Sequence, residues 1–119
     1  YGGNGKGKKQ CVTDGVFADF QVMYPKSGCL QRSYLKGKAV GALPSTEVIT
    51  KALSEATTFA KFRKRLELDI HPYLHNQVGG AMRSMASPSD PIFWGHHGFI
   101  DQIYWQWQKE DSKRVTRFS

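Results

Sequence analysis

The fold is decided by the stretch Asp90–Lys109, which reads DPIFWGHHGFIDQIYWQWQK. Asp90 followed by Pro91 is typical of a helix start, because aspartate caps the free first-turn amides and proline fits the first helical position. Apolar and aromatic residues then cover nearly the whole circumference of the helix that this stretch predicts. Such a helix has to be buried on all sides, so other segments or another chain must cover it.

Further helices are predicted upstream of this stretch. Ser45 predicts the cap of a first helix, and Thr57 or Thr58 can cap a second one, because hydroxyl side chains accept hydrogen bonds from free first-turn amides. The segment Asp69–Pro72 predicts another helix start, since proline fits the first turn. Gly79–Gly80 then predicts the end of that helix. The chain from Ser45 onward is therefore expected to be largely helical.

The N-terminal part has a different character. Residues 1–10 read YGGNGKGKKQ, and this glycine- and lysine-rich composition predicts a flexible N-terminus. Apolar residues alternate loosely between Val16 and Tyr24, which is typical of one or two short strands. The expected fold class is therefore mainly α, with irregular N-terminal loops and short strands.

Length and charge limit the functions that this chain can have. Its 119 residues suffice for one domain, and its net charge of +7 raises nucleic acid as a partner. The basic residues, however, fall in three separate clusters around Lys8, Lys64 and Arg114, which is more typical of solvated surfaces and chain ends. We therefore expect no nucleic-acid partner, and salt-dependent binding would test that alternative. No stretch approaches the ~18 consecutive apolar residues of a membrane span, so no membrane partner is expected.

The two cysteines leave the cellular compartment open. The loop-like flanks of Cys11 and Cys29 suit a disulfide that closes a loop of about 17 residues, but two separate thiols fit the sequence as well. Secretion follows only from the disulfide. The chain begins at Tyr1 and carries no signal-like apolar segment, so we expect a processed or trimmed product.

All four histidines lie between His71 and His97. His71 and His75 are four residues apart, so a helix places both imidazoles on one face. His96 and His97 are adjacent on the last predicted helix and point about 100° apart, so only one of them can face the first pair. Three imidazoles from two packed helices are enough to bind copper or zinc. The alternative is that these histidines are ordinary core residues with hydrogen-bond partners.

Four motifs in this region resemble the second copper-binding half of tyrosinases, which are type-3 copper proteins. They are the histidine pair of His71–His75, the glycine turn of Val78–Met82, the run SPSDPIFWGHH of Ser87–His97 and the WQWQ end of Trp105–Gln108. Weaker similarity to the segment between the two copper motifs of fungal and invertebrate tyrosinases extends over Cys11–Ala18, Cys29–Arg32 and Phe62–Glu67. The resemblance implies a tyrosinase-like second-copper half-domain over residues 11–119.

This resemblance implies a copper site and its ligands. One copper ion would be held by His71, His75 and His97, and His96 would be the adjacent, non-ligating histidine. The family binds O2 between two copper ions, each held by three histidines, and oxidises phenols or catechols to o-quinones. A complete site holds two copper ions, of which this chain would bind one (CuB). Phe93 would pack beneath the ligands, and a phenolic substrate and O2 would be the small-molecule partners.

The resemblance also implies two catalytic residues. Glu67 matches the glutamate that helps to hold the water used to deprotonate a monophenol, and Asn76 lies beside His75, where the family often tunes activity. Pro72 departs from the asparagine that often follows the first ligand in monophenol-hydroxylating members, and it has no side-chain hydrogen bond to offer. We therefore expect catechol oxidation more than monophenol hydroxylation. Asp101, one turn after the last ligand, could orient that ligand or be a solvated carboxylate.

The first copper ion of the family has no ligands in this sequence, because no histidine lies outside residues 71–97. The family's two copper ions lie within a four-helix bundle, so this chain would form a helical half-bundle that needs a protein partner. That partner would be an N-terminal tyrosinase half or a second copy of this chain. A secreted or vesicular location is expected. The alternatives are a mononuclear three-histidine protein that binds copper or zinc without oxidase activity, and an interaction module that lost the chemistry.

Overall fold

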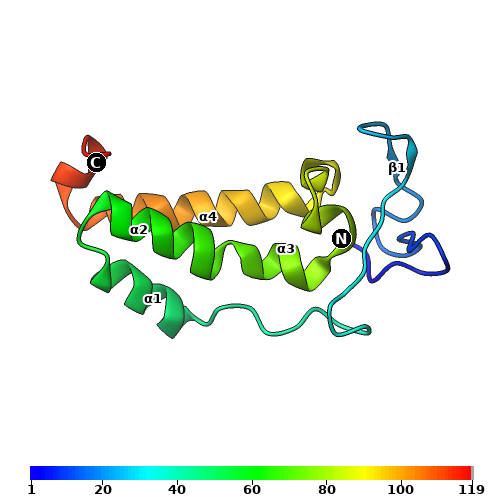
Figure 1. Ribbon diagram of the computed structural model, residues 1–119, viewed down its shortest axis with the longest axis horizontal. Helices are drawn as coiled ribbons and strands as arrows, with labels where there is room; N and C mark the ends of the chain where they lie inside the picture. Colours follow the sequence, from blue (N-terminus) through cyan, green and yellow to red (C-terminus); the bar gives the residue numbers. More distant parts are fainter. Residues whose placement is uncertain (119) are drawn as a thin grey trace. The chain divides into compact units, whose positions relative to one another are not determined.

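The computed structural model describes residues 1–118, so Ser119, the last residue of the predicted half-domain, lies outside the described part (Figure 1). The chain divides into two compact units. We call Tyr1–Ala42 together with Leu74–His96 the loop unit. We call Leu43–Tyr73 together with the chain from His97 the helical unit.

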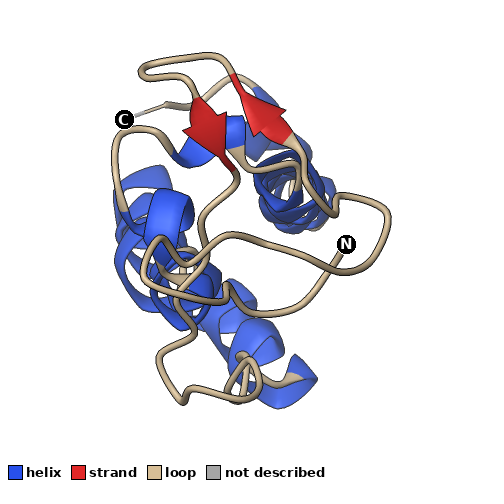
Figure 2. Cartoon of the chain, turned by 90° about the vertical axis from the view of Figure 1, so that its right-hand side faces the viewer, coloured by secondary structure: helices blue, strands red, loops and turns tan. Residues whose placement is uncertain are grey.

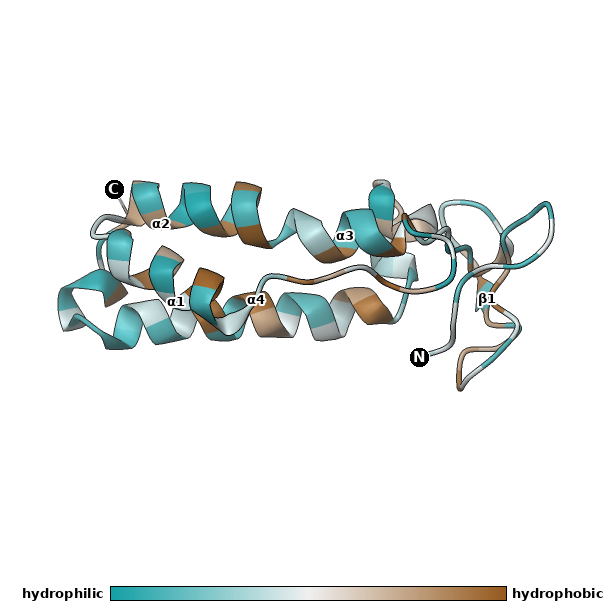
Figure 3. Cartoon of the chain, turned by 90° about the horizontal axis from the view of Figure 1, so that it is seen from below, coloured by the Kyte–Doolittle hydropathy of each residue, from teal (hydrophilic) through white to brown (hydrophobic). Residues whose placement is uncertain are grey.

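Most of the helical unit is formed by amphipathic helices. Its elements are α1 (Thr46–Glu55), α2 (Phe59–Arg65), the π-helical turn η1 (Leu66–Ile70), the part of α4 (Ile92–Lys109) that follows His96, and the 3-10 turn η4 (Ser112–Val115). Figure 3 shows polar and apolar residues alternating along α1 and α2. This alternation is typical of helices that bury one face and leave the other in water.

The predicted helix starts in this unit are confirmed. The Ser45 hydroxyl accepts a hydrogen bond of 3.4 Å from the amide of Val48, and it caps α1. The Thr58 hydroxyl accepts one of 3.3 Å from the amide of Lys61, so Thr58 rather than Thr57 caps α2. Each hydroxyl satisfies a first-turn amide that has no partner within its helix.

A π-helical turn stands where the sequence predicts a separate helix start. α2 continues directly into η1, and the amide of His71 donates to the carbonyl of Leu66, five residues back, over 2.9 Å. α3 (Pro72–Val78) then begins at the proline, as expected, but no gap precedes it. In a regular helix the Pro72 ring would collide with the carbonyl of the preceding turn. The wider turn relieves that crowding and lets the helix continue.

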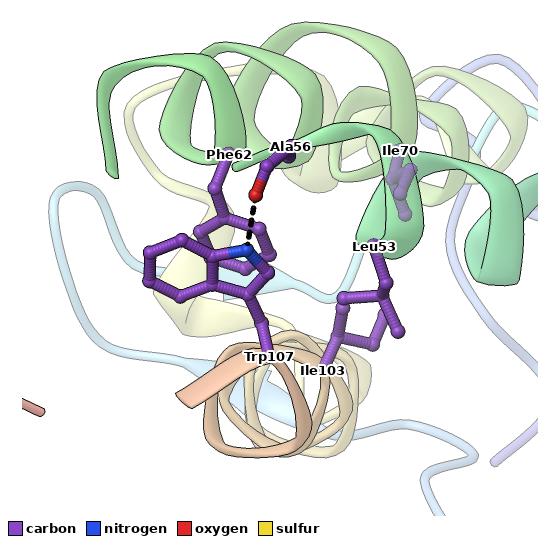
Figure 4. Close-up of a cluster of buried hydrophobic side chains, with 6 residues drawn as sticks. All are labelled: Leu53, Ala56, Phe62, Ile70, Ile103 and Trp107. Atoms are coloured by element: carbon purple, nitrogen blue, oxygen red, sulfur yellow. Dashed lines mark hydrogen bonds between the residues drawn. The ribbon is translucent and has the colours of Figure 1, made fainter. Parts of the chain in front are cut away.

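The core of the helical unit is a cluster of aromatic and aliphatic side chains (Figure 4). The rings of Phe62 and Trp107 stack with their centroids 4.4 Å apart and their planes 12° from parallel. The indole N–H of Trp107 donates a 2.6 Å hydrogen bond to the buried carbonyl of Ala56. The buried members of the cluster are Leu53, Ala56, Phe62, Ile70, Ile103 and Trp107.

The loop unit contains the strands that the sequence predicts. β1 (Gln21–Val22) pairs in antiparallel register with β2 (Gly28–Cys29), and the two strands are the red arrows in Figure 2. A disulfide joins Cys11 to Cys29, which resolves the alternative that the sequence left open. The unit therefore has a covalent connection where its secondary structure is sparse.

The remaining elements of the loop unit follow Tyr73. α3 ends at Val78, and Gly79 and Gly80 follow with φ angles of 61° and 56°, which confirms the predicted glycine stop. Two 3-10 turns, η2 (Gly80–Arg83) and η3 (Ser87–Ser89), lead to the first residues of α4.

Hydrogen bonds connect the N-terminal residues to the rest of the loop unit. The Arg32 guanidinium donates to the carbonyls of Tyr1 and Gly2, and the amide of Gly5 donates to the carbonyl of Arg32. Lys6 and Cys11 form an isolated antiparallel bridge. These contacts do not measure motion, so the flexibility of residues 1–10 stays a prediction.

The start and end of α4 match the prediction. The Asp90 carboxylate accepts a 3.0 Å hydrogen bond from the amide of Ile92, and the helix ends at Lys109. The helix is not buried on all sides within this chain, because Trp94, Phe99 and Trp105 are 65%, 47% and 54% exposed. No helix within residues 1–118 is long and apolar enough to cross a membrane. The mainly α fold class is confirmed.

Candidate metal centre

His71 and His97 form a pair within the helical unit. His71 follows η1 directly, and its ring centroid lies 5.1 Å from that of His97, with the ring planes at 71°. A π-helical turn shifts the face on which the following side chains lie, and such turns are frequent at functional sites. Here the turn comes immediately before a predicted metal ligand.

His75 and His96 form a second pair, which lies within the loop unit. Their ring centroids are 5.1 Å apart, and the His96 side chain is buried. Nδ1 of His75 lies 2.6 Å from the carbonyl oxygen of Met82. A carbonyl oxygen only accepts hydrogen bonds, so Nδ1 must carry a proton, and in the neutral ring Nε2 then has the lone pair. The ring of Phe93 lies 6.1 Å from that of His75, edge to face.

The donor atoms at these positions suit copper or zinc. Neutral imidazole nitrogens are common ligands of both metals. Within the loop unit, the imidazoles of His75 and His96 are close enough to share a metal ion. The resemblance instead implies His97 as the third ligand. The choice between His96 and His97 stays a prediction that substitution of each residue can test.

Glu67 lines the same open groove of the helical unit as His71. The groove has a volume of about 320 Å³, and its walls are mostly aromatic and aliphatic. The Glu67 carboxylate is exposed and lies 3.3 Å from Nη1 of Arg63. The groove is lined by Phe59, Phe62, Arg63, Leu66, Glu67, His71, Ile100 and Tyr104. Apolar walls with a few polar groups are typical of sites for small aromatic molecules.

The other two predicted polar residues lie on helix surfaces. Asn76 is exposed on α3, immediately after His75. Asp101 is exposed on α4, one helical turn after His97. The proposed catalytic role of Asn76 and the orienting role of Asp101 stay predictions.

A buried ion pair in the loop unit was not predicted from the sequence. Nε and Nη2 of Arg32 each donate a 2.8 Å hydrogen bond to the Asp90 carboxylate, and both side chains are fully buried. Burial by itself would lower the pKa of the Arg32 guanidinium, but the hydrogen bonds and charge of Asp90, with a contribution from Tyr34, raise this pKa above its usual value. The pair is therefore held in its charged form.

The linear sequence holds little information about this pair. Arg32 lies in a loop segment without periodic pattern, and Asp90 is already explained as a helix cap. The two residues are 58 positions apart, and no single-sequence pattern connects residues at that separation. The resemblance of Cys29–Arg32 to a family segment was the one available signal, and it did not indicate a partner.

Comparison with known proteins identifies the family. The family described as the common central domain of tyrosinase matches residues 2–110. The chain is 30% identical to the tyrosinase-like protein phomQ2 of Diaporthe leptostromiformis, over 96% of this chain and 33% of that protein. It is 35% identical to a tyrosinase of Streptomyces lincolnensis, over 91% of this chain and 45% of that enzyme. The chain thus spans between a third and just under a half of the length of these curated relatives. It belongs to the tyrosinase family.

Proposed function

We propose that this chain supplies one copper site of a binuclear type-3 centre that oxidises phenols or catechols to o-quinones with O2. The observation that carries the proposal is that all four histidines form ring pairs, 5.1 Å apart, inside the region that matches the tyrosinase domain. Family membership supports an oxidoreductase that uses copper. The role of one half-site and the phenolic substrate are the parts that we propose.

The residues present fit a copper ion. The ligands would be His71, His75 and His97, and because Nδ1 of His75 donates to the Met82 carbonyl, Nε2 would be the nitrogen that binds the metal ion. Two copper ions in a complete site, one of them bound by this chain, would together supply two of the electrons that the reduction of O2 requires. His96, next to the proposed ligand on α4, is the alternative third ligand.

The chain's own residues would bind the phenol and receive its proton. The apolar groove beside His71 offers aromatic and aliphatic walls for a phenol ring, and Glu67 at this groove would help to hold the water that takes the hydroxyl proton. Asn76, exposed beside His75, would tune this step. Pro72 cannot donate a hydrogen bond to that water, which favours catechols as substrates because they are easier to oxidise than monophenols.

A partner would complete the centre. The chain covers 45% of the Streptomyces lincolnensis tyrosinase, and it has no histidine outside residues 71–97 to bind another copper ion. We propose an N-terminal tyrosinase half as the partner, with a second copy of this chain as the alternative. The partner would cover apolar surface that α4 exposes at Trp94, Phe99 and Trp105. The disulfide supports a secreted or vesicular location.

Metal analysis with matched histidine variants tests the ligand set. We expect about one copper ion per chain. His97→Ala should lower the copper affinity by roughly 100-fold, because the loss of a ligand should reduce the affinity at least as much as the loss of a residue that supports a ligand. His96→Ala is the matched control on the adjacent position and should change the affinity little. The reverse result would reassign the third ligand to His96, and equal affinities in all variants would refute the metal site.

Reconstitution tests the oxidase activity. Mixing the copper-loaded chain with an N-terminal tyrosinase half should produce o-quinone from a catechol, and the chain alone should not. A mononuclear three-histidine protein, the alternative function, would bind one copper or zinc ion and stay inactive with every partner. The observation that supports this alternative is that all four histidines lie within residues 71–97, which is enough for one metal site but not for two. An interaction module would bind the partner half without binding metal.

A further inference from the structure

The His75 ring is hydrogen-bonded to a backbone carbonyl. The 2.6 Å contact between Nδ1 and the Met82 oxygen requires a proton on Nδ1, so Nε2 is the unprotonated nitrogen whenever the ring is neutral. Met82 is fully buried and lies in η2, two residues after Gly80, and Gly79 and Gly80 both have positive φ angles. The position of this turn therefore decides whether the carbonyl reaches the imidazole.

The turn is attached to the segment formed by residues 31–35. The amide of Ala81 donates to the Gln31 carbonyl over 3.0 Å, and the amide of Ser33 donates to the Val78 carbonyl over 3.1 Å. A Cβ atom added at Gly80 would collide with the carbonyl of Gln31, so the two backbones are in close contact. The segment therefore holds both the end of α3 and the turn that carries Met82.

Arg32 lies within this segment, and its side chain is directed at Asp90, which begins α4. The buried guanidinium makes two 2.8 Å hydrogen bonds to Asp90 and two more to the carbonyls of Tyr1 and Gly2. Asp90 in turn accepts hydrogen bonds from the amides of Ile92 and Phe93, which fixes the first turn of α4. A bidentate guanidinium–carboxylate pair sets the angle as well as the distance between its partners.

The first turns of α4 carry the side chains that pack against the His75 ring. Phe93 and His96 place their rings 6.1 Å and 5.1 Å from it, both edge to face. The backbone of residues 31–33 thus fixes the hydrogen-bond acceptor of His75, and the side chain of Arg32 fixes the helix that packs on His75. Both supports meet at Arg32.

We propose that Arg32 is a positioning residue for His75: through Asp90 and the Gly79–Met82 turn, it holds the imidazole in the Nδ1-protonated tautomer that presents Nε2 to a metal ion. The expected change in copper affinity rests on the function proposed above. The expected change in the His75 tautomer does not, because it is measured in the metal-free chain.

The test is the tautomer of His75 in Arg32→Lys and Asp90→Asn. Lysine keeps the charge but cannot form the bidentate pair, and asparagine keeps the shape and the cap acceptor of Asp90. In ¹⁵N-labelled, metal-free protein at about pH 8, where an ordinary imidazole is neutral, the wild type should show one Nδ1–H tautomer of His75. Both variants should show a mixture of tautomers, and their affinity for copper(I), measured with bicinchoninate as competitor, should fall roughly 10- to 100-fold.

Matched controls separate positioning from stability. Arg83→Lys makes the same substitution at an exposed arginine of η2 and should leave both readouts unchanged. Trp107→Phe lowers stability in the helical unit and should leave the tautomer single. If either Arg32→Lys or Asp90→Asn fails to fold, Gly80→Ala displaces the turn directly and should also give a mixture.

The outcomes are distinct. A single tautomer in the folded Arg32 and Asp90 variants would overturn the positioning role, whatever their copper affinity. A mixture in these variants together with a wild type that binds no copper would sustain the positioning role and refute the proposed function. A mixture in Arg83→Lys as well would show that the tautomer responds to any change near η2, and it would also overturn the proposal.

Discussion

The loop unit and the helical unit are stabilised internally by different kinds of interaction. The helical unit has a continuous apolar cluster in which Phe62 stacks on Trp107. The loop unit has short strands, a disulfide and a fully buried ion pair. Exposed ion pairs such as Lys51–Glu55 and Arg63–Glu67 lie in the helical unit, and the buried Arg32–Asp90 pair lies in the loop unit.

This difference follows from secondary structure. An amphipathic helix brings an apolar residue to the same face at each turn, so a few helices bury a shared core without specific polar contacts. Irregular chain has no such repeat and must satisfy its backbone and polar groups one at a time. The loop unit should therefore depend on a few individual contacts, and the helical unit on the sum of many.

The largest effect is expected for Asp90→Ala. This change leaves the Arg32 guanidinium buried without its charged partner, and breaking a buried pair in this way costs about 3 to 5 kcal/mol. Hydrogen exchange measured by mass spectrometry should show loss of protection in the loop unit, with less change in α1 and α2. Lys51→Ala, which removes an exposed ion pair with Glu55, should cost less than about 1 kcal/mol. Equal loss of protection in both units would mean that they are not separately stabilised.

The next effect is expected for the double variant Cys11→Ser, Cys29→Ser. A cross-link that closes a loop of this length contributes about 3 kcal/mol in the chain-entropy model. Chemical denaturation of the variant, compared with the wild type with and without reductant, should give that loss. Reductant should destabilise the wild type and leave the variant unchanged. A variant as stable as the oxidised wild type would show that the loop unit does not need its covalent connection.

A smaller effect is expected for Trp107→Phe in the helical unit. Phenylalanine can still stack on Phe62, but it leaves the buried carbonyl of Ala56 without its donor and removes part of the indole volume, for a loss of about 2 kcal/mol. Thermal unfolding measures the loss. Trp105→Phe is the matched control, because Trp105 is half exposed and gives up only its contact with Lys109. Similar losses for the two variants would contradict the assigned core.

The comparison also explains how much could be predicted from sequence. Caps and glycine stops depend on neighbouring residues only, so Ser45, Gly79 and Asp90 were predicted as they are found, and the second cap was narrowed to Thr57 or Thr58. The π-helical turn at residues 66–70 was not predicted, because Pro72 indicated the start of a new helix and not a helix that continues through the proline. Local chemistry predicts where a helix begins but not how a helix continues through a proline.

The candidate site divides in the same way. The i, i+4 spacing of His71 and His75 and the motif around His97 identified the candidate ligands and the family. The hydrogen bond from His75 to the Met82 carbonyl and the Arg32–Asp90 pair were missed. Both depend on contacts between segments without periodic pattern. Such supporting contacts follow from tertiary structure, and one sequence does not indicate them.

The smallest effect is expected for Ser45→Ala at the start of α1. The cap bond of 3.4 Å is long, so its loss should cost about 0.5 to 1 kcal/mol in thermal unfolding. A hydrogen bond from the Ser45 side chain is the main cause that lowers the pKa of the exposed Glu47 carboxyl. A hydrogen bond from the backbone of Glu47 itself is the second cause. A carboxyl whose pKa is lower in the folded state stabilises the fold above its unfolded pKa, and this contribution is lost as the pH falls through the folded value.

Ser45→Ala should therefore raise the pKa of Glu47 toward its ordinary value. The free energy of unfolding of the variant should then fall less steeply than that of the wild type as the pH is lowered from about 5 to about 3. An NMR titration of the Glu47 side chain, with Thr58→Ala as the control cap on α2, measures the shift. An unchanged Glu47 titration would remove Ser45 as its cause. It would also show that this helix start, like the core beneath it, depends on many small contributions and not on one polar contact.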